Sequence, residues 1–386
     1  MSPKFRLHVL GVPHTRTNLD YVACAYTQKA YKFCKMMTER GHTVFHYGVE
    51  GSNPLCTENI TVVSNEVYNK VYGEHDFHLK FFRYDTNDEC YQTFYANAIR
   101  EINARKGDFD IVLPFWGAGV RAICDNLDPH FVVIEPGIGY GEGSWCEYRV
   151  FESYGIYQAY CGTGAITNCN MNNYDVVIPN YFDKEDFTYN GDIRSRLLDD
   201  PYFLFVGRVY EGKGVHIAMQ VCEKLGVKLK IAGQLGDEYR GYNWPENIEF
   251  VGHVDKYQRN ELMRNAIASF LPSQYLEPFG GVQIENLLCG TPTITSDWGA
   301  FAENNINGVT GYRCRTFEDY INAALNCLEG KIRYEDCYNK GQEFILENVA
   351  PRYEKFFTDV YNIYRDNGWY ALSAETMDRI NRWQQR

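Results

Sequence analysis

Two glutamates beside a glycine turn form the most chemically informative pattern in this sequence. The stretch LEPFGGVQIENLLCGTPTITSDWG, residues 276–299, has turn residues followed by apolar positions at helical spacing, so a helix is expected to begin at Gly280 and Gly281. The first N–H groups of a helix lack partners and suit a phosphate. Glu277 and Glu285 could accept hydroxyls at the two ends of a nucleotide sugar. Either glutamate alone is better explained as a solvated surface carboxylate.

A second glycine-rich turn supplies positive charge. The apolar run 202–206 predicts a strand, and GRVYEGKG follows it at 207–214. Arg208 and Lys213 would project from this turn toward the end of the strand, where together they could hold a diphosphate. When this motif is taken alone, two solvated cations on a turn explain it equally well.

The two motifs together resemble one enzyme family. A Glu, then Pro-Phe-Gly, then a second Glu after seven intervening residues closely resembles the E-x7-E signature of retaining glycosyltransferases of family 4. The run FVGR followed by KG resembles the phosphate-binding pair of the same family. The resemblance covers almost the whole chain and is strongest over residues 205–312. Within the family, the chain looks like glycosyltransferases encoded by large chlorella-type viruses.

This resemblance implies roles for residues of both motifs. Arg208, Lys213 and Glu277 are expected to be catalytic, because they would hold the leaving phosphates and the transferred sugar. The residues expected to bind the donor are Gly207, His253, Val254, Pro278, Phe279, Gly280, Gly281 and Glu285.

The implied reaction moves a hexose from a nucleotide sugar to a glycan, a glycoprotein or another hydroxyl acceptor, with retention of configuration. GDP-mannose is the expected donor, and a UDP-sugar is the alternative. Asp108 and Asp110 fit the entry to a strand better than a metal site. The two cations are therefore expected to replace a divalent metal, and no metal or cofactor is expected.

Length and composition limit the class of protein. A chain of 386 residues with 45% hydrophobic content suits two folded domains. The net charge of −12 argues against non-specific nucleic-acid binding. Thirteen cysteines without a C-x-x-C pair, and no secretory leader, indicate reduced thiols in the cytoplasm, or the host cytoplasm for a viral protein. No apolar run is long enough to cross a bilayer, although peripheral membrane contact remains open.

Strand and helix patterns alternate along the chain, which predicts an α/β protein of the GT-B type: two Rossmann-like parallel-sheet domains facing a central cleft. Residues 1–190 are expected to form the acceptor domain and residues 191–355 the nucleotide-sugar domain. Residues 356–386 are expected to be helical and to cross back onto the first domain. The predicted strands lie at 5–12, 43–47, 110–115, 131–134, 174–183, 202–206, 228–232, 248–251 and 293–295.

The acceptor is expected to bind at two loops of the first domain. His14 and Thr15 follow the first predicted strand, at the edge where open parallel sheets place ligands. Gly139 and Tyr140 lie in GIGYGEG after the strand 131–134. Two features depart from the family: the first loop lacks its double glycine, and Glu135 stands where a histidine often follows the strand.

Three other classes of protein remain open. A nicotinamide oxidoreductase could use GAGVRA, in which Gly117, Gly119 and Ala122 fit a dinucleotide-binding turn. That alternative leaves the two cations and two glutamates without a role. A non-catalytic sugar-nucleotide or glycan-binding subunit would tolerate the altered loops. An epimerase or phosphorylase would use the same two-domain plan.

Overall fold

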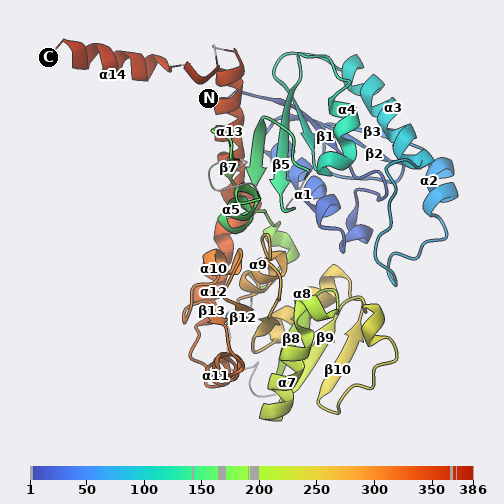
Figure 1. Ribbon diagram of the computed structural model, residues 1–386, viewed down its shortest axis with the longest axis vertical. Helices are drawn as coiled ribbons and strands as arrows, with labels where there is room; N and C mark the ends of the chain where they lie inside the picture. The colour runs from blue at the N-terminus through green and yellow to red at the C-terminus, as the bar shows by residue number, and fades with distance from the viewer. Residues whose placement is uncertain are drawn as a thin grey trace.

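The computed structural model describes residues 3–140, 143–163, 171–189, 191, 200–365, 368–370 and 372–385. Figure 1 shows two lobes, each built around one sheet with helices packed on it, and a long helix that runs along the edge of both. The predicted α/β class with two Rossmann-like parallel sheets is confirmed. The boundary predicted at 190–191 adjoins residues 190 and 192–199, which lie outside the described residues.

The N-terminal sheet has seven parallel strands in the order β3-β2-β1-β4-β5-β6-β7. Strand order therefore reverses beside β1, and such a reversal opens a crevice at the carboxyl ends of the strands. Its strands are β1 (Arg6–Leu10), β2 (Thr43–Val49), β3 (Glu58–Val63), β4 (Asp110–Pro114), β5 (Val132–Ile138), β6 (Tyr148–Phe151) and β7 (Val176–Val177).

The C-terminal sheet repeats this plan with six parallel strands in the order β10-β9-β8-β11-β12-β13. Its strands are β8 (Tyr202–Val206), β9 (Lys228–Ala232), β10 (Ile248–Gly252), β11 (Ser269–Leu271), β12 (Thr293–Ser296) and β13 (Gly311–Cys314).

Helices follow most strands and cover both sheets (Figure 1). In the N-terminal lobe they are α1 (Ala25–Glu39), α2 (Asn65–Tyr72), α3 (Glu89–Ala104), α4 (Arg121–Cys124) and α5 (Tyr154–Cys161). In the C-terminal lobe they are α7 (Val215–Leu225), α8 (Lys256–Asn265), α9 (Gly281–Leu288), α10 (Phe301–Asn304), α11 (Phe317–Leu328) and α12 (Tyr334–Gly341). Two further helices end the chain, α13 (Leu346–Arg365) and α14 (Ala374–Gln384).

Each lobe has its own apolar core. In the C-terminal lobe every residue of β8 is buried, as an apolar run between two layers of helices requires. Along α7, apolar residues recur at helical spacing, so one face of this helix packs on the sheet. These patterns are strong enough that β8 and β9 have the predicted boundaries.

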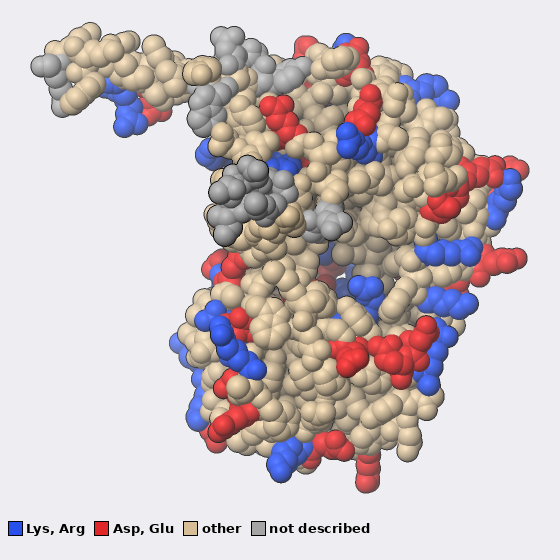
Figure 2. All heavy atoms as spheres, viewed as in Figure 1, with Lys and Arg blue, Asp and Glu red and all other residues tan. Residues whose placement is uncertain are grey.

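Helix α13 joins the two lobes. It leaves the C-terminal lobe and packs Val349, Tyr353 and Phe357 into the core of the N-terminal lobe, beside Phe5 and Phe33. The crossing begins at the start of α13, earlier in the chain than the predicted position 356. Helix α14 buries none of its side chains and projects from the N-terminal lobe (Figures 1 and 2).

The strand predicted at 131–134 was too short. Strand β5 continues to Ile138, so Glu135 lies within the sheet and not in a loop. Its carboxylate is fully buried and accepts hydrogen bonds from the hydroxyls of Tyr140 and Ser144. Burial raises the pKa of Glu135. This residue therefore stabilises the turn after β5.

Acid should weaken the N-terminal lobe through buried histidines such as His46. Its Nδ1 lies 2.7 Å from Oδ1 of Asn59 and its Nε2 lies 2.9 Å from Oγ1 of Thr17, and burial lowers its pKa from 6.5 to about 4. Between pH 6.5 and about pH 4, His46 is protonated in the unfolded chain but neutral in the folded chain. In this range the free energy of unfolding falls by about 1.4 kcal/mol for each unit that the pH is lowered. Urea unfolding at pH 7 and pH 5 should show a smaller loss in His46→Gln than in the wild type. Equal losses would contradict this assignment.

Candidate functional site

A cavity of about 530 Å³ lies between the two lobes, at the carboxyl ends of both sets of strands. Figure 2 shows a hollow at this place with Lys or Arg atoms at its edge. All the residues predicted to be catalytic or to bind the donor line this cavity. They are Gly207, Arg208, Lys213, His253, Val254, Glu277, Pro278, Phe279, Gly280, Gly281 and Glu285.

Lys213 and Glu277 form an ion pair across two loops. Lys213 follows β8 and Glu277 follows β11, and the Lys213 Nζ lies 2.8 Å from Oε2 of Glu277. The hydroxyl of Ser273 donates to the same carboxylate oxygen at 2.9 Å. Tyr275 packs its ring 4.9 Å from the ammonium, and burial, followed by the charge of Glu277, raises the pKa of this tyrosine. A charged carboxylate is thus held in a fixed position at the edge of the cavity.

Arg208 differs from Lys213 because its charge is not neutralised. Its guanidinium is exposed to the cavity and lies over the rings of Phe81 and Tyr210 at 5.1 and 5.7 Å. Among the described residues it has no ion-pair partner. An exposed guanidinium at the rim of a cavity can bind an anion through several N–H groups at once.

The start of α9 requires glycine. Gly280 has a φ of 77°, and a Cβ there would lie 2.5 Å from Cε1 of Phe301. Within the part of the chain that the structure describes, no side chain caps the start of this helix, so its first N–H groups are open beside the cavity lining at Gly281. The backbone therefore adds partial positive charge near Lys213.

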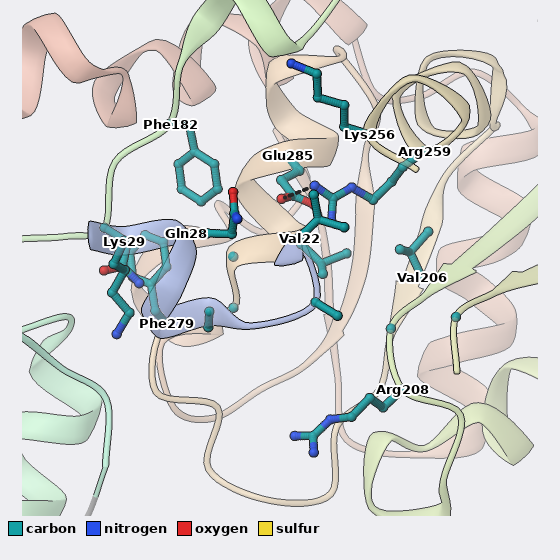
Figure 3. Close-up of a pocket in the computed structure, with 18 of the residues that line it drawn as sticks. Val22, Gln28, Lys29, Phe182, Val206, Arg208, Lys256, Arg259, Phe279 and Glu285 are labelled. Atoms are coloured by element: carbon teal, nitrogen blue, oxygen red, sulfur yellow. Dashed lines mark ion pairs between the residues drawn. The ribbon is translucent and has the colours of Figure 1, made fainter. Parts of the chain in front are cut away.

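Glu285 lies deeper in the cavity and is 6% exposed. Its Oε1 pairs with the Arg259 guanidinium at 3.1 Å, as the dashed line in Figure 3 marks. Its Oε2 is buried and has no hydrogen-bond partner among the described residues. A buried carboxylate oxygen without a partner is costly unless a donor reaches it. In Figure 3, Arg208 lies on the opposite side of the drawn cavity from this pair.

The N-terminal lobe supplies charged residues that the sequence did not single out. Helix α1 contributes Lys29 and Lys32 to the lining, and the loop after β6 contributes Glu152. The Lys29 ammonium pairs with Glu152 and donates to the carbonyl of Gly137 at 2.8 Å. Burial lowers the pKa of Lys32, whose ammonium lies 4.5 Å from the Phe182 ring. Only the helical spacing of the two lysines on α1 could have indicated a shared face.

Of the residues predicted to bind the acceptor, Gly139 alone lines the cavity. The ring of His14 is buried against Tyr84, Tyr91 and Trp116, and burial lowers its pKa to about 3. The buried hydroxyl of Thr15 lies 2.6 Å from that of Thr27. Tyr140 donates to Glu135. The structure therefore does not bring His14, Thr15 or Tyr140 to the cavity.

The loop of the N-terminal lobe that carries Phe77 and His78 reaches the C-terminal lobe beside the cavity. The Gln234 amide donates to the carbonyl of Phe77 at 2.5 Å. The rings of His78 and His253 meet edge to face at 5.3 Å. His253 is exposed to solvent. Partial burial of its ring, followed by the nearby charges of His78 and Arg259, lowers its pKa. The two lobes thus contact each other beside the predicted donor residues.

Side chains of the protein fill the space beside Gly117 and Gly119, where the predicted dinucleotide-binding turn would hold a pyrophosphate. A Cβ on Gly117 would lie 2.4 Å from the Tyr140 hydroxyl, and one on Gly119 would lie 2.2 Å from the Trp116 ring. Neither glycine lines the cavity between the lobes. A pyrophosphate would need the place that these aromatic side chains occupy. This geometry argues against the oxidoreductase alternative.

Asp110 has structural partners at the start of β4. Its carboxylate accepts from Arg6 at 2.8 Å and lies 3.1 Å from Nε2 of His8. Among the described residues, no group of three or more His, Cys, Asp or Glu side chains is arranged to hold a metal ion. In the same part of the chain, no helix is long and apolar enough to cross a membrane.

Comparison with known proteins finds a family match in the C-terminal lobe. Residues 192–344 match the family model of glycosyl transferases group 1. A glycogen synthase of Mycobacterium tuberculosis is 40% identical over 122 residues, which are 29% of this chain and 29% of that protein. A glycogen synthase of Thermodesulfovibrio yellowstonii is 27% identical over 366 residues, or 88% of this chain and 66% of that protein. The chain thus matches about 29% of the length of the first relative.

A solved structure shares the whole architecture. Sucrose-phosphate synthase from Thermosynechococcus elongatus superimposes with a TM-score of 0.68 at 17% identity, covering 93% of this chain and 99% of that one. At this identity the likeness concerns the fold alone. It confirms the predicted GT-B arrangement of two Rossmann-like domains.

Arg208→Ala should weaken the binding of a nucleoside diphosphate. A charge-assisted hydrogen bond contributes about 1.5–3 kcal/mol, so the dissociation constant should rise about 10- to 100-fold. Titration calorimetry with UDP, ADP and GDP would measure this change. Arg240→Ala is the matched control, because Arg240 pairs with Asp237 outside the cavity lining. Equal affinities of wild type and Arg208→Ala would remove Arg208 from the phosphate site.

Proposed function

Because residues 192–344 match glycosyl transferases group 1, we propose that this chain transfers a hexose from a nucleoside diphosphate sugar to a hydroxyl acceptor, with retention of configuration. One observation carries the proposal: a single cavity brings together two cations, an open helix start and two carboxylates. These are the groups that a diphosphate, a sugar and a ribose require. The oxidoreductase alternative leaves all of them without a role.

The donor would lie along the cavity from Glu285 to Glu277. The ribose hydroxyls would donate to the unpartnered Oε2 of Glu285, which removes the cost of burying that oxygen. The diphosphate would lie between Arg208, Lys213 and the start of α9. The transferred sugar would then reach Glu277.

The chemistry follows from where charge develops. As the bond between the anomeric carbon and the diphosphate breaks, negative charge grows on the leaving oxygens and positive charge on the sugar ring. Arg208 and Lys213 stabilise the first charge, and Glu277 stabilises the second while it orients the sugar. The acceptor hydroxyl forms its bond on the same face, in keeping with the family that the sequence resembles. Closer contact between the lobes, which already meet at Gln234 and Phe77, would exclude water that would otherwise hydrolyse the donor.

No divalent metal is needed in this proposal. Two side-chain cations and the helix start supply the positive charge that a metal would bring to a diphosphate. The charges of the site support this, since Glu277 and Glu285 pair with Lys213 and Arg259.

The identity of the sugar is the least constrained part of the proposal. GDP-mannose is the donor that the sequence resemblance favours. The two relatives are named glycogen synthases, and glycogen is a polymer of glucose, which favours a glucosyl donor. We therefore place UDP-glucose and ADP-glucose beside GDP-mannose as first candidates. The acceptor would be a glycan or glycoprotein, bound against α1 and the loops at Gly139 and Glu152.

A panel of nucleotide sugars tests the proposal directly. At about 100 times its dissociation constant the true donor should stabilise the protein by roughly 2.7 kcal/mol and raise its melting temperature. The same donor should be hydrolysed slowly without an acceptor, and EDTA should leave that rate unchanged. Binding without hydrolysis would favour a non-catalytic sugar-nucleotide-binding subunit. A rate lost to EDTA and restored by Mg²⁺ or Mn²⁺ would contradict the metal-independent proposal.

Changing each of the two glutamates to Gln should affect a different kinetic constant. Glu285 would contact a ribose distant from the breaking bond, so Glu285→Gln should mainly raise the KM for the donor. Glu277 would contact the reacting sugar, so Glu277→Gln should mainly lower kcat. Steady-state kinetics with one donor measures both. The reverse pattern would mean that the donor lies in the opposite direction, and no effect from either would make this stretch a structural turn.

A further inference from the structure

The amino end of α5 lies against the C-terminal lobe. Ser153 caps this helix, because its Oγ accepts the backbone N–H of Ile156 at 3.1 Å. The same hydroxyl donates its proton to the carbonyl oxygen of Pro278 at 2.5 Å. Ser153 is 2% exposed, so water does not compete for either bond. One side chain therefore links a helix of the N-terminal lobe to the residue after Glu277.

Glu303 holds the same helix end from the C-terminal lobe. Its carboxylate accepts the backbone N–H groups of Tyr154 at 3.0 Å and of Gly155 at 2.5 Å. These N–H groups carry the partial positive charge of a helix start, which a carboxylate matches. A Cβ on Gly155 would lie 2.9 Å from the carbonyl carbon of Gly299, so glycine permits this close approach. Figure 1 shows α5 where the two lobes meet, close to α10.

The backbone that carries Glu277 is held at three consecutive carbonyl groups. Two of the three donors belong to the C-terminal lobe, at the start and end of α10, and the third comes from the N-terminal lobe. The bonds are Ala300 N–H to Glu277 O at 3.0 Å, Ser153 Oγ to Pro278 O at 2.5 Å, and Asn304 Nδ2 to Phe279 O at 3.3 Å. The segment is fully restrained only when α5 is in contact.

We propose that Ser153 is a positioning residue for Glu277, and that it couples contact between the lobes to the catalytic geometry. This inference rests on the proposed function. With α5 docked, the Pro278 carbonyl is fixed, and the Glu277 carboxylate is held beside Lys213 and the transferred sugar. With the lobes apart, this restraint is lost and Glu277 gains freedom. Among the described residues, Arg208 contacts Phe81 and Tyr210, and Glu285 pairs with Arg259, with no contact to α5. Nucleotide binding should therefore persist when α5 is released.

Ser153→Ala tests the proposal by separating turnover from binding. The variant should lower kcat about tenfold, which corresponds to one hydrogen bond lost at the reacting end. The donor KM and the dissociation constant for the nucleoside diphosphate should stay within about twofold. Glu303→Gln should lower kcat in the same direction, because an amide oxygen accepts less strongly than a carboxylate. In Ser153→Ala, hydrogen exchange should quicken at residues 277–281 and 154–157.

Ser64→Ala is the matched control. Ser64 caps α2 in the same way, accepting the N–H of Val67 at 3.4 Å, and within the described part of the chain it has no hydrogen bond to the C-terminal lobe. It should leave kcat unchanged. A wild-type kcat in Ser153→Ala, or an equal loss in Ser64→Ala, would overturn the positioning role. A wild-type protein that binds no nucleoside diphosphate would instead overturn the proposed function.

Discussion

The ion pair between Lys213 and Glu277 is the interaction on which the site depends. It joins the loop after β8 to the loop after β11, and both side chains are mostly shielded from water. A shielded charge without a partner is costly, so the ion pair holds both side chains in place. A bound diphosphate would share Lys213, and the developing charge on the sugar would then become the partner of Glu277. In the proposed reaction, the ion pair would thus prepare both charges.

Much of the fold could be predicted because local patterns decide it. In the C-terminal lobe, apolar runs of strand length end at glycines, and helices of regular spacing follow them. Some residues predicted to bind the donor were accessible from the strand pattern, since Gly207, His253 and Val254 closely follow predicted strands, and parallel strands bring their carboxyl ends to one edge. Glu277 and Glu285 were predicted from the E-x7-E resemblance. Strands β3, β6, β11 and β13 were not predicted. Strands β6, β11 and β13 have four, three and four residues, too few for a clear period.

The acceptor side could not be predicted because distant segments decide it. His14 follows β1 as expected, but Tyr84, Tyr91 and Trp116 cover its ring, and no local pattern indicates those contacts. Lys29 meets Glu152 across more than a hundred residues of sequence. The contact of Ser153 with the Pro278 carbonyl also joins two lobes. The first two contacts depend on how distant segments of the N-terminal lobe pack, and the third depends on how the two lobes pack. Local sequence patterns indicate neither.

A crystal structure with a bound nucleoside diphosphate tests the central claim most directly. The account predicts diphosphate oxygens within hydrogen-bond distance of Arg208, Lys213 and the first N–H groups of α9. It also predicts the ribose hydroxyls at Oε2 of Glu285 and the terminal phosphate directed toward Glu277. A diphosphate bound away from these cations, or a ribose at Glu277, would contradict it.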